Sequence, residues 1–159
     1  MKITNIQFYI ENQSKTELFL DSVIALFKIK LGKDIQLNNL DDYNNLMGEN
    51  EVDIYYQIEI ENSKNPFNTV IRLLLQNENI KKAFDYFDFI NEILLLTKEQ
   101  VMIPVGNTSY DYLLFDSGSK YFQVEESGSN ENGGILFYSK LELSLLAVKK
   151  IINSNYDLR

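Results

Sequence analysis

The most regular pattern in the chain is the alternation of apolar and polar residues from 51 to 61. The apolar set is Val52, Ile54, Tyr56, Ile58 and Ile60, and the polar set is Glu51, Asp53, Tyr55, Gln57, Glu59 and Glu61. Successive side chains of a strand point to opposite faces of a sheet, so this period of two predicts a strand. The first set is expected to point inward, and the second set is expected to lie on an open face.

Two further segments predict strands. Residues 2–10 alternate in the same way, with apolar residues at every second position from Ile6 to Ile10. Residues 67–76 are rich in Val, Ile and Leu and follow a turn at 62–66, so they are expected to pair back on the strand at 51–61. The segment 33–50 is predicted to be irregular, with room for a short helix near 40–47, because its Asn and Gly residues favour turns.

Two segments carry apolar residues at helical spacing, which places those residues on one side of a helix. The first stripe consists of Phe19, Leu20, Val23, Ile24, Phe27 and Leu31, and the second of Ile80, Ala83, Phe84, Phe87, Ile90 and Leu94. Ser14–Glu17 has the spacing of a capping box that begins the first helix, and Gly32 is placed to end it in a left-handed conformation. Asn77 or Asn79 is expected to cap the second helix.

The last third of the chain predicts short strands and a final helix. The strands are expected at 100–105, 110–116, 120–125 and 135–138. Ser139–Glu142 is a second capping-box match, so a helix is expected to start there. Its apolar face consists of Leu141, Leu145, Val148 and Ile152.

The order of the predicted elements is β-α-β-β-α, then a β-meander, then a C-terminal helix. The first five elements and the strand after them match the split βαβ, or ferredoxin-like, order. No internal repeat and no linker divides the chain. We therefore predict one α+β domain with a mainly antiparallel sheet over residues 1–153, followed by a C-terminal tail at 154–159.

All of the excess charge of the chain lies in residues 34–63, which we call the acidic window. It holds eight acidic residues and no Lys or Arg, a local charge of −8. The whole chain has 15 basic and 23 acidic residues, also a net charge of −8, so the remainder balances at 15 against 15. A concentrated negative field attracts a basic partner and speeds its arrival.

We predict that a basic protein binds the acidic window. Like charges two residues apart on a strand stand roughly 7 Å apart, a row that a basic nuclease groove can accept in place of nucleic acid. A surface tyrosine among these acids offers contact area at low entropic cost. The predicted partner-binding residues are Asp41, Asp42, Glu49, Glu51, Asp53, Tyr55, Glu59 and Glu61. A solvated face that keeps the protein in solution, weak metal binding by the oxygen donors, and a Tyr55 covered by a neighbouring element are the alternatives.

The chain lacks the residues that several functional classes require. The chain has no Cys and no His, which removes thiolate chemistry and the commonest general acid/base and metal ligand. The EF-hand pattern fails because Gly48 is wrongly placed. Neither Ser117–Ser119 nor Ser127–Ser129 fits a nucleophile turn or a phosphate loop. Scattered bases and the negative net charge disfavour nucleic-acid binding. We expect no cofactor and no resident metal.

A carboxylate-based enzyme is the remaining catalytic hypothesis. A catalytic pair needs one desolvated acid. Asp85 and Asp88 are the acids nearest to an apolar run, and both are expected on the polar face of the second helix. The aromatic residues around them are expected to belong to the core. The sequence therefore predicts a protein that is not an enzyme.

No secretion signal or membrane span is visible in the sequence. Residues 1–10 alternate like a strand and do not join a basic stretch to an apolar block. No apolar run approaches the roughly 18 residues of a membrane span. The expectation is a soluble cytoplasmic protein.

The assembled features resemble bacterial immunity proteins of contact-dependent inhibition and polymorphic-toxin systems, which are small, acidic α+β domains without a catalytic constellation. Val101–Gly106 followed by Tyr110–Asp116 also resembles a strand-turn-strand of the SUKH superfamily of immunity proteins. The chain begins with a strand and lacks the usual N-terminal helix of that superfamily, so no residue role is carried over.

The resemblance implies an inhibitor that blocks a basic toxin, a nuclease, by covering its substrate groove with an acidic surface. Reversing the charges of Glu51 and Asp53 together is expected to weaken binding and to leave folding intact. An adaptor whose partner is not a toxin is the alternative, and its complex would be insensitive to salt. No membrane or nucleic-acid partner is expected.

Overall fold

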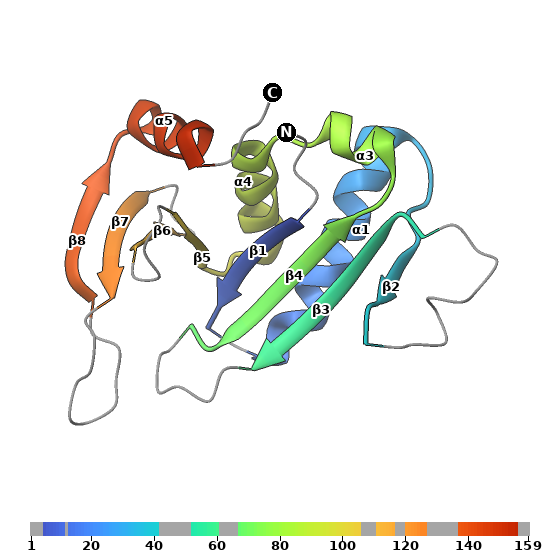
Figure 1. Ribbon diagram of the computed structural model, residues 1–159, viewed down its shortest axis with the longest axis horizontal. Coiled ribbons are helices and arrows are strands. Elements are labelled where there is room, and N and C mark those ends of the chain that lie inside the picture. Colours follow the sequence, from blue (N-terminus) through green and yellow to red (C-terminus); the bar gives the residue numbers. More distant parts are fainter. Residues whose placement is uncertain are drawn as a thin grey trace.

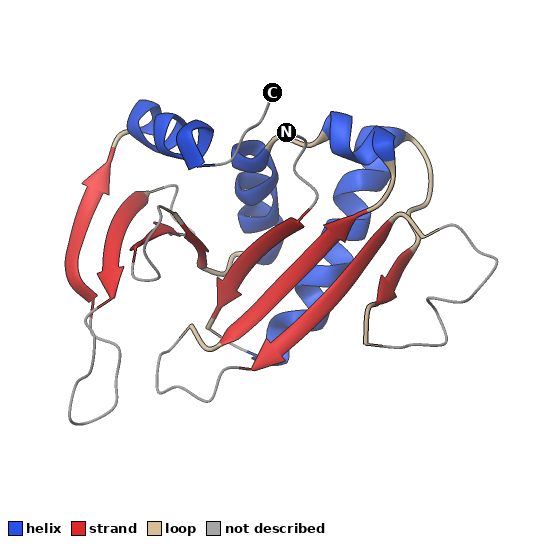
Figure 2. Cartoon of the chain, in the orientation of Figure 1, coloured by secondary structure: helices blue, strands red, loops and turns tan. Residues whose placement is uncertain are grey.

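The structure is a computed structural model, and it describes residues 5–11, 13–41, 52–60, 67–105, 111–116, 120–126 and 137–155. Its strands form one mostly antiparallel sheet in the order β2-β3-β4-β1-β5-β6-β7-β8 (Figures 1 and 2). The strands are β1 (Asn5–Ile10), β2 (Leu37–Asn39), β3 (Ile54–Ile60), β4 (Thr69–Leu75), β5 (Val101–Pro104), β6 (Asp111–Phe115), β7 (Tyr121–Glu126) and β8 (Phe137–Leu143). The helices are the 3-10 turn η1 (Gln13–Lys15), α1 (Thr16–Leu31), α3 (Glu78–Ala83), α4 (Tyr86–Thr97) and α5 (Leu145–Asn155). The predicted α+β class is confirmed.

The centre of the sheet has the predicted split βαβ order. β4 lies between β1 and β3 and is antiparallel to both, and β5 pairs antiparallel with the other edge of β1. Helix α1 connects β1 to the β2–β3 part of the sheet, and α3 and α4 connect β4 to β5. In Figure 1 α1 lies behind β3 and β4, and buried side chains of α1, α3 and α4 form one core cluster with those of the central strands, so these helices pack on one face of the sheet. β6, β7 and β8 then extend the sheet as an antiparallel meander.

One strand was not predicted. β2 pairs parallel with β3 at the outer edge of the sheet, through Leu37 opposite Ile54 and Asn39 opposite Tyr56. The segment 33–50 was predicted to be irregular because its Asn residues favour turns. The pairing with β3 overrides that local preference over three residues. The short helix expected near 40–47 lies mostly outside the described residues.

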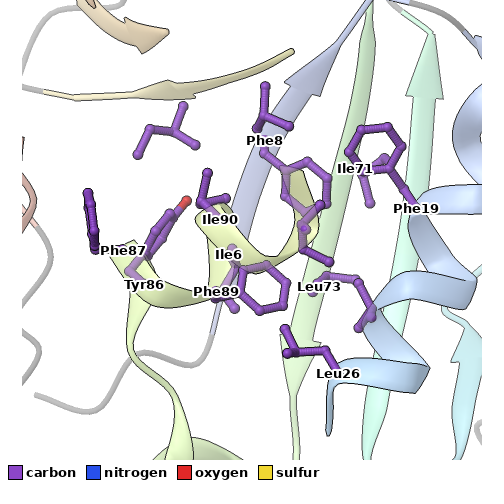
Figure 3. Close-up of a cluster of buried hydrophobic side chains, with 14 of the residues drawn as sticks. Ile6, Phe8, Phe19, Leu26, Ile71, Leu73, Tyr86, Phe87, Phe89 and Ile90 are labelled. Carbon is purple, nitrogen blue, oxygen red and sulfur yellow. The ribbon is translucent and has the colours of Figure 1, made fainter. Parts of the chain in front are cut away.

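The main core lies between the sheet and its helices, and aromatic rings fill much of it (Figure 3). The ring of Phe8 on β1 lies 5.9 Å from that of Phe19 on α1 and 6.5 Å from that of Phe89 on α4. Tyr86 is fully buried, and its hydroxyl donates a hydrogen bond to the carbonyl of Gln7 at 3.0 Å. This bond gives the buried hydroxyl the partner that it requires, and it links α4 to β1.

The other face of the sheet carries a second apolar cluster. Its buried residues come from the strands and from the residue that leads into β4, and none comes from a helix: Tyr9, Phe67, Val70, Met102, Tyr112, Leu114 and Val124, with Phe122 partly buried beside them. We call this side the helix-free face, meaning that no helix of the described residues packs on it. The sheet is therefore apolar on both sides around β1, β5 and β6, which alternation within single strands did not predict.

The first helix ends as predicted and begins differently. Gly32 has a φ of 70°, and its N–H donates to the carbonyl of Lys28 at 2.8 Å, which is the left-handed C-cap expected of glycine. The expected capping box at Ser14–Glu17 is wrong. The chain enters α1 through η1, the N-cap residue is Lys15, and no side chain caps it. The buried face of α1 also includes Leu26, which the predicted stripe omitted.

The second predicted helix is two helices. Asn77 caps α3, as expected, by accepting a hydrogen bond from the N–H of Asn79 at 2.8 Å. The backbone is extended at Phe84 and Asp85. Asp85 then caps α4 by accepting from the N–H of Asp88 at 2.9 Å. Asp85 was expected on the polar face of one long helix, and it serves instead to start a new one.

The second capping-box prediction is also wrong. Ser139–Glu142 lies within β8, whose register with β7 places Leu143 opposite Tyr121. Helix α5 begins after Ser144, whose hydroxyl accepts from the N–H of Ala147 at 3.2 Å. Val148 and Ile152 are buried as predicted. Leu141 lies on the strand and is 60% exposed, so it does not belong to the apolar face of the helix.

Candidate partner-binding site

The described part of the acidic window forms the β2–β3 end of the sheet. β3 presents Tyr55, Gln57 and Glu59 on the helix-free face, while Ile54, Tyr56 and Ile58 pack toward the helices. The predicted alternation of this strand is therefore confirmed over these residues. Its last apolar residue, Ile60, is 48% exposed and was wrongly expected to point into the core.

Asp41 lies at the end of β2 and reaches the same surface. Its carboxylate accepts a hydrogen bond from the side-chain amide of Gln57 at 3.0 Å, and its N–H donates to the Asn39 side chain at 2.9 Å. Asp41 is exposed. The carboxylate is thus held by a neighbouring amide and is open to solvent, where a partner can reach it. We call Asp41, Tyr55, Gln57 and Glu59 the acidic edge.

Glu59 is partly neutralised by a neighbour on β4. Its carboxylate forms an ion pair with the guanidinium of Arg72, whose Nε donates to Gln7 at 3.3 Å. The amide of Gln7 in turn donates to the hydroxyl of Tyr9 at 2.9 Å. A row of polar contacts thus crosses the helix-free face from β3 to β1. The side chain of Glu59 is 54% exposed, so part of the carboxylate still faces solvent.

Asp53 has a structural position. Its two carboxylate oxygens accept hydrogen bonds from the backbone N–H of Gln36 at 2.8 Å and from the side-chain amide of Asn77 at 2.6 Å. Its backbone N–H and carbonyl bond to Gln36 and Gln76. Asp53 therefore ties together the entry to β2, the start of β3 and the cap of α3. Its carboxylate is bonded inside the fold, and among the predicted site residues that the structure describes it is the least suited to a partner.

Replacing Asp53 with Ala is expected to lower the free energy of unfolding by about 1–3 kcal/mol, because two polar groups lose their partner. Urea unfolding of the variant and the parent measures this difference. Asp41→Ala is the matched control, since Asp41 is exposed, and it is expected to change the free energy by less than about 0.5 kcal/mol. Equal effects at the two positions would contradict the structural assignment of Asp53.

The remaining predicted residues divide into two groups. Tyr55 is half-buried, with Asn38 and Leu74 as its neighbours on the adjacent strands. Part of its side chain therefore faces solvent, and its role as a contact residue stays a prediction. The other predicted site residues, Asp42, Glu49, Glu51 and Glu61, lie outside the described residues, as do the two Ser-Gly-Ser segments.

Sequence reasoning missed Arg72 and Gln7. Both lie on the helix-free face, and they connect the acidic edge to the second apolar cluster. The alternation of 67–76 would have placed Arg72 on the same side as Val70 and Leu74. The pairing of that strand with β1, which brings Gln7 opposite Arg72, has no local signal in the sequence.

Two observations on the described residues concern a metal site and a pocket. No group of three or more Asp or Glu side chains among them is arranged to hold a metal ion. An open depression of about 730 Å³ lies along α5 and is lined by Leu146, Lys149, Lys150, Asn153 and Ser154. This lining holds two lysines and no carboxylate, so it offers no acid pair. Within the described part of the chain, no helix is both long and apolar enough to cross a membrane.

The fold and site define an α+β protein whose split βαβ centre is extended by a meander and whose helix-free face carries an acidic edge. Comparison with known proteins found no matching family model and no match among curated proteins or solved structures.

Proposed function

We propose that this chain is an immunity-type inhibitor, which binds a basic toxin domain, a nuclease, and covers its substrate groove with the acidic edge. The observation that carries the proposal is the grouping of Asp41 and Glu59 with Tyr55 on one face at one end of the sheet. The whole excess charge of the chain belongs to the acidic window, whose described residues form this end. We place its action in the bacterial cytoplasm.

The physical basis of the inhibition is electrostatic steering followed by occlusion. A negative surface raises the association rate with a positive groove, and the groove loses access to nucleic acid while the complex lasts. Tyr55 is the proposed anchor, because aromatic side chains near the centre of an interface carry much of the binding free energy. The pairing of β2 with β3 holds these groups at one end of the sheet.

The first experiment isolates partners of the tagged full-length protein from lysate of the source cells. The column is washed at low and then at high salt, and each fraction is identified by mass spectrometry. The expected result is one basic protein, bound stoichiometrically and released by salt because exposed charge pairs are screened. Its nuclease activity is expected to fall when the protein is added back. Recovery of no such protein would overturn the proposal.

Reversing two charges of the acidic edge is expected to weaken this complex at least about tenfold, because like charges would face the partner. The variant is Asp41→Lys with Glu59→Lys, measured by titration calorimetry at low salt. Both side chains are exposed, and the loss of a surface ion pair with Arg72 costs only about 0–1 kcal/mol, so the fold is retained. Reversal at Asp53 is not a suitable test, since that carboxylate is hydrogen-bonded within the fold.

The matched control is Glu11→Lys with Asp21→Lys, two exposed acids outside the acidic window. Both double variants change the net charge from −8 to −4. A specific docking surface predicts a change of less than about threefold for the control, because acids outside the interface form no pair with the partner and act only through the screened long-range field. Equal losses for the two variants would show that only the net charge matters. A complex unaffected by salt and by both variants would favour the adaptor hypothesis.

A further inference from the structure

The two outer edges of the sheet differ in length. Strand order ends at β2 on one side and at β8 on the other, and within the described residues no strand pairs with the outer edge of either. β2 has three residues, whereas β8 has seven. An edge strand presents unpaired N–H and C=O groups that can pair with another chain. β8 is therefore the edge that can accept a further strand.

Exposed apolar side chains concentrate beside this edge. Leu141 on β8 is 60% exposed, and Leu145 and Leu146 at the start of α5 are 49% and 79% exposed. The described residues include eight exposed large apolar side chains, and these three lie within six positions of one another. Single exposed leucines need no explanation, but a group of them next to an open strand edge is typical of an interface.

We propose that β8 pairs antiparallel with β8 of a second copy of this chain, with Leu141 of each copy on the two-fold axis. In this register Leu141 lies opposite its own copy, and position 140, a lysine, lies opposite position 142, a glutamate, twice. Opposite charges on directly opposite positions stabilise an antiparallel pair. A two-fold interface requires this kind of self-complementary surface.

The pairing of β8 with β7 fixes which face each position occupies. Positions 140 and 142 lie opposite Val124 and Phe122, on the helix-free face. Leu141 lies opposite Gln123 on the other face, the side on which α5 follows. The positions 140 and 142 therefore alternate with position 141 along the joined strands. Leu145 and Leu146 of each copy begin four residues from the axis, on the leucine side.

The neighbouring registers are less favourable. Centring the two-fold on position 140 places two lysines opposite each other, and centring it on Glu142 places two glutamates opposite each other. Like charges directly opposite destabilise a strand pair. The sequence of this edge therefore fits a second copy of the chain, and it fits in one register.

The acidic edge lies at the far end of the sheet and stays free in the dimer. A failure of the dimer proposal would therefore leave the proposed function untouched, and the reverse also holds.

Cross-linking tests the register. The chain has no Cys, so a single introduced thiol can pair only with its copy. The Leu141→Cys variant of the full chain is expected to form a disulfide-linked dimer under mild oxidation, because opposite Cα atoms in an antiparallel pair lie within disulfide range. Leu95→Cys on α4, where Leu95 is 73% exposed, is the control for random collision and is expected to stay monomeric. Equal cross-linking of both variants, or none of Leu141→Cys, would overturn the proposal.

A charge exchange tests the same contact without cross-linking. The parent is expected to show a concentration-dependent mass by sedimentation up to about 100 μM, as a reversible dimer does. Lys140→Glu alone and Glu142→Lys alone each place two like-charged pairs opposite and are expected to weaken the dimer about tenfold. The double exchange restores opposite charges and is expected to return the affinity to within about threefold of the parent. A monomeric parent, or a double variant as weak as the single ones, would contradict the pairing.

Discussion

The Phe89→Ala variant is expected to lose about 3–5 kcal/mol of unfolding free energy, a large part of the roughly 5–15 kcal/mol that holds a domain together. Phe89 is 1% exposed, and its ring centroid lies 5.1 Å from that of Phe84, 5.9 Å from that of Phe27 and 6.5 Å from that of Phe8. Phe89 thus packs against the α3–α4 junction, α1 and β1 together, and Figure 3 shows its ring within the core. Removal of this ring leaves a cavity that three elements would have to collapse to fill.

Urea unfolding at constant pH measures the loss, and two variants on the same helix define its origin. Phe89→Leu keeps most of the apolar volume and is expected to cost clearly less than Phe89→Ala. Leu95→Ala removes a side chain that is 73% exposed and is expected to change the free energy by less than about 0.5 kcal/mol. A loss below about 1 kcal/mol for Phe89→Ala would mean that α4 does not pack on the sheet as described.

The centre of the fold could be predicted because its signals are local and repeated. The alternation of 51–61 gave the inward residues Ile54 and Ile58, and the helical stripes gave Phe19 and Phe87. Periodicity of this kind indicates burial directly, because residues at every second position of a strand, or at helical spacing, lie on the same face. The element order then restricted the sheet to the split βαβ arrangement that β3, β4, β1 and β5 adopt.

Element boundaries failed where two local signals competed. Ser139–Glu142 has capping-box spacing, but the same residues pair with β7 and Ser144 supplies the cap of α5. The aromatic run around Phe84 did not reveal the break between α3 and α4. The apolar stripe continues past Asp85, and nothing in it shows that the Asp85 side chain caps a second helix. Where a helix starts depends on which residues the sheet takes up by strand pairing and which remain free to cap a helix. A short sequence motif does not contain that information.

The candidate site was predictable in its charge and unpredictable in its contacts. The concentration of acids is visible in the sequence, and Asp41 and Glu59 do reach one surface. The partners of Asp53 come from 17 and 24 residues away, so no local pattern could separate this structural carboxylate from the exposed ones. Charge counts identify where a field originates, whereas the use of each carboxylate depends on long-range hydrogen bonds.

The second large effect is expected on the helix-free face, where Met102→Ala should lower the free energy of unfolding by about 2–5 kcal/mol. Met102 is 0% exposed although no described helix packs on its side of the sheet. Its neighbours across the strands are Tyr9 and Leu114, both buried in the same cluster. The ring of Tyr9 meets that of Tyr112 edge to face at 5.7 Å, which gives the cluster the packing of a core.

Phe122→Ala, at a partly buried position of the same cluster, is the control and is expected to cost less than Met102→Ala despite the larger side chain removed. Thermal and urea unfolding of the two variants compare their free energies. If the helix-free face were solvated in solution, truncating Met102 would cost no more than about 0.5 kcal/mol, as at other surface positions. A large loss of unfolding free energy in Met102→Ala would instead indicate that the two halves of this face have different roles. The half around β1, β5 and β6 would hold the sheet together, which leaves the β2–β3 half, with Asp41 and Glu59, as the part open to a partner.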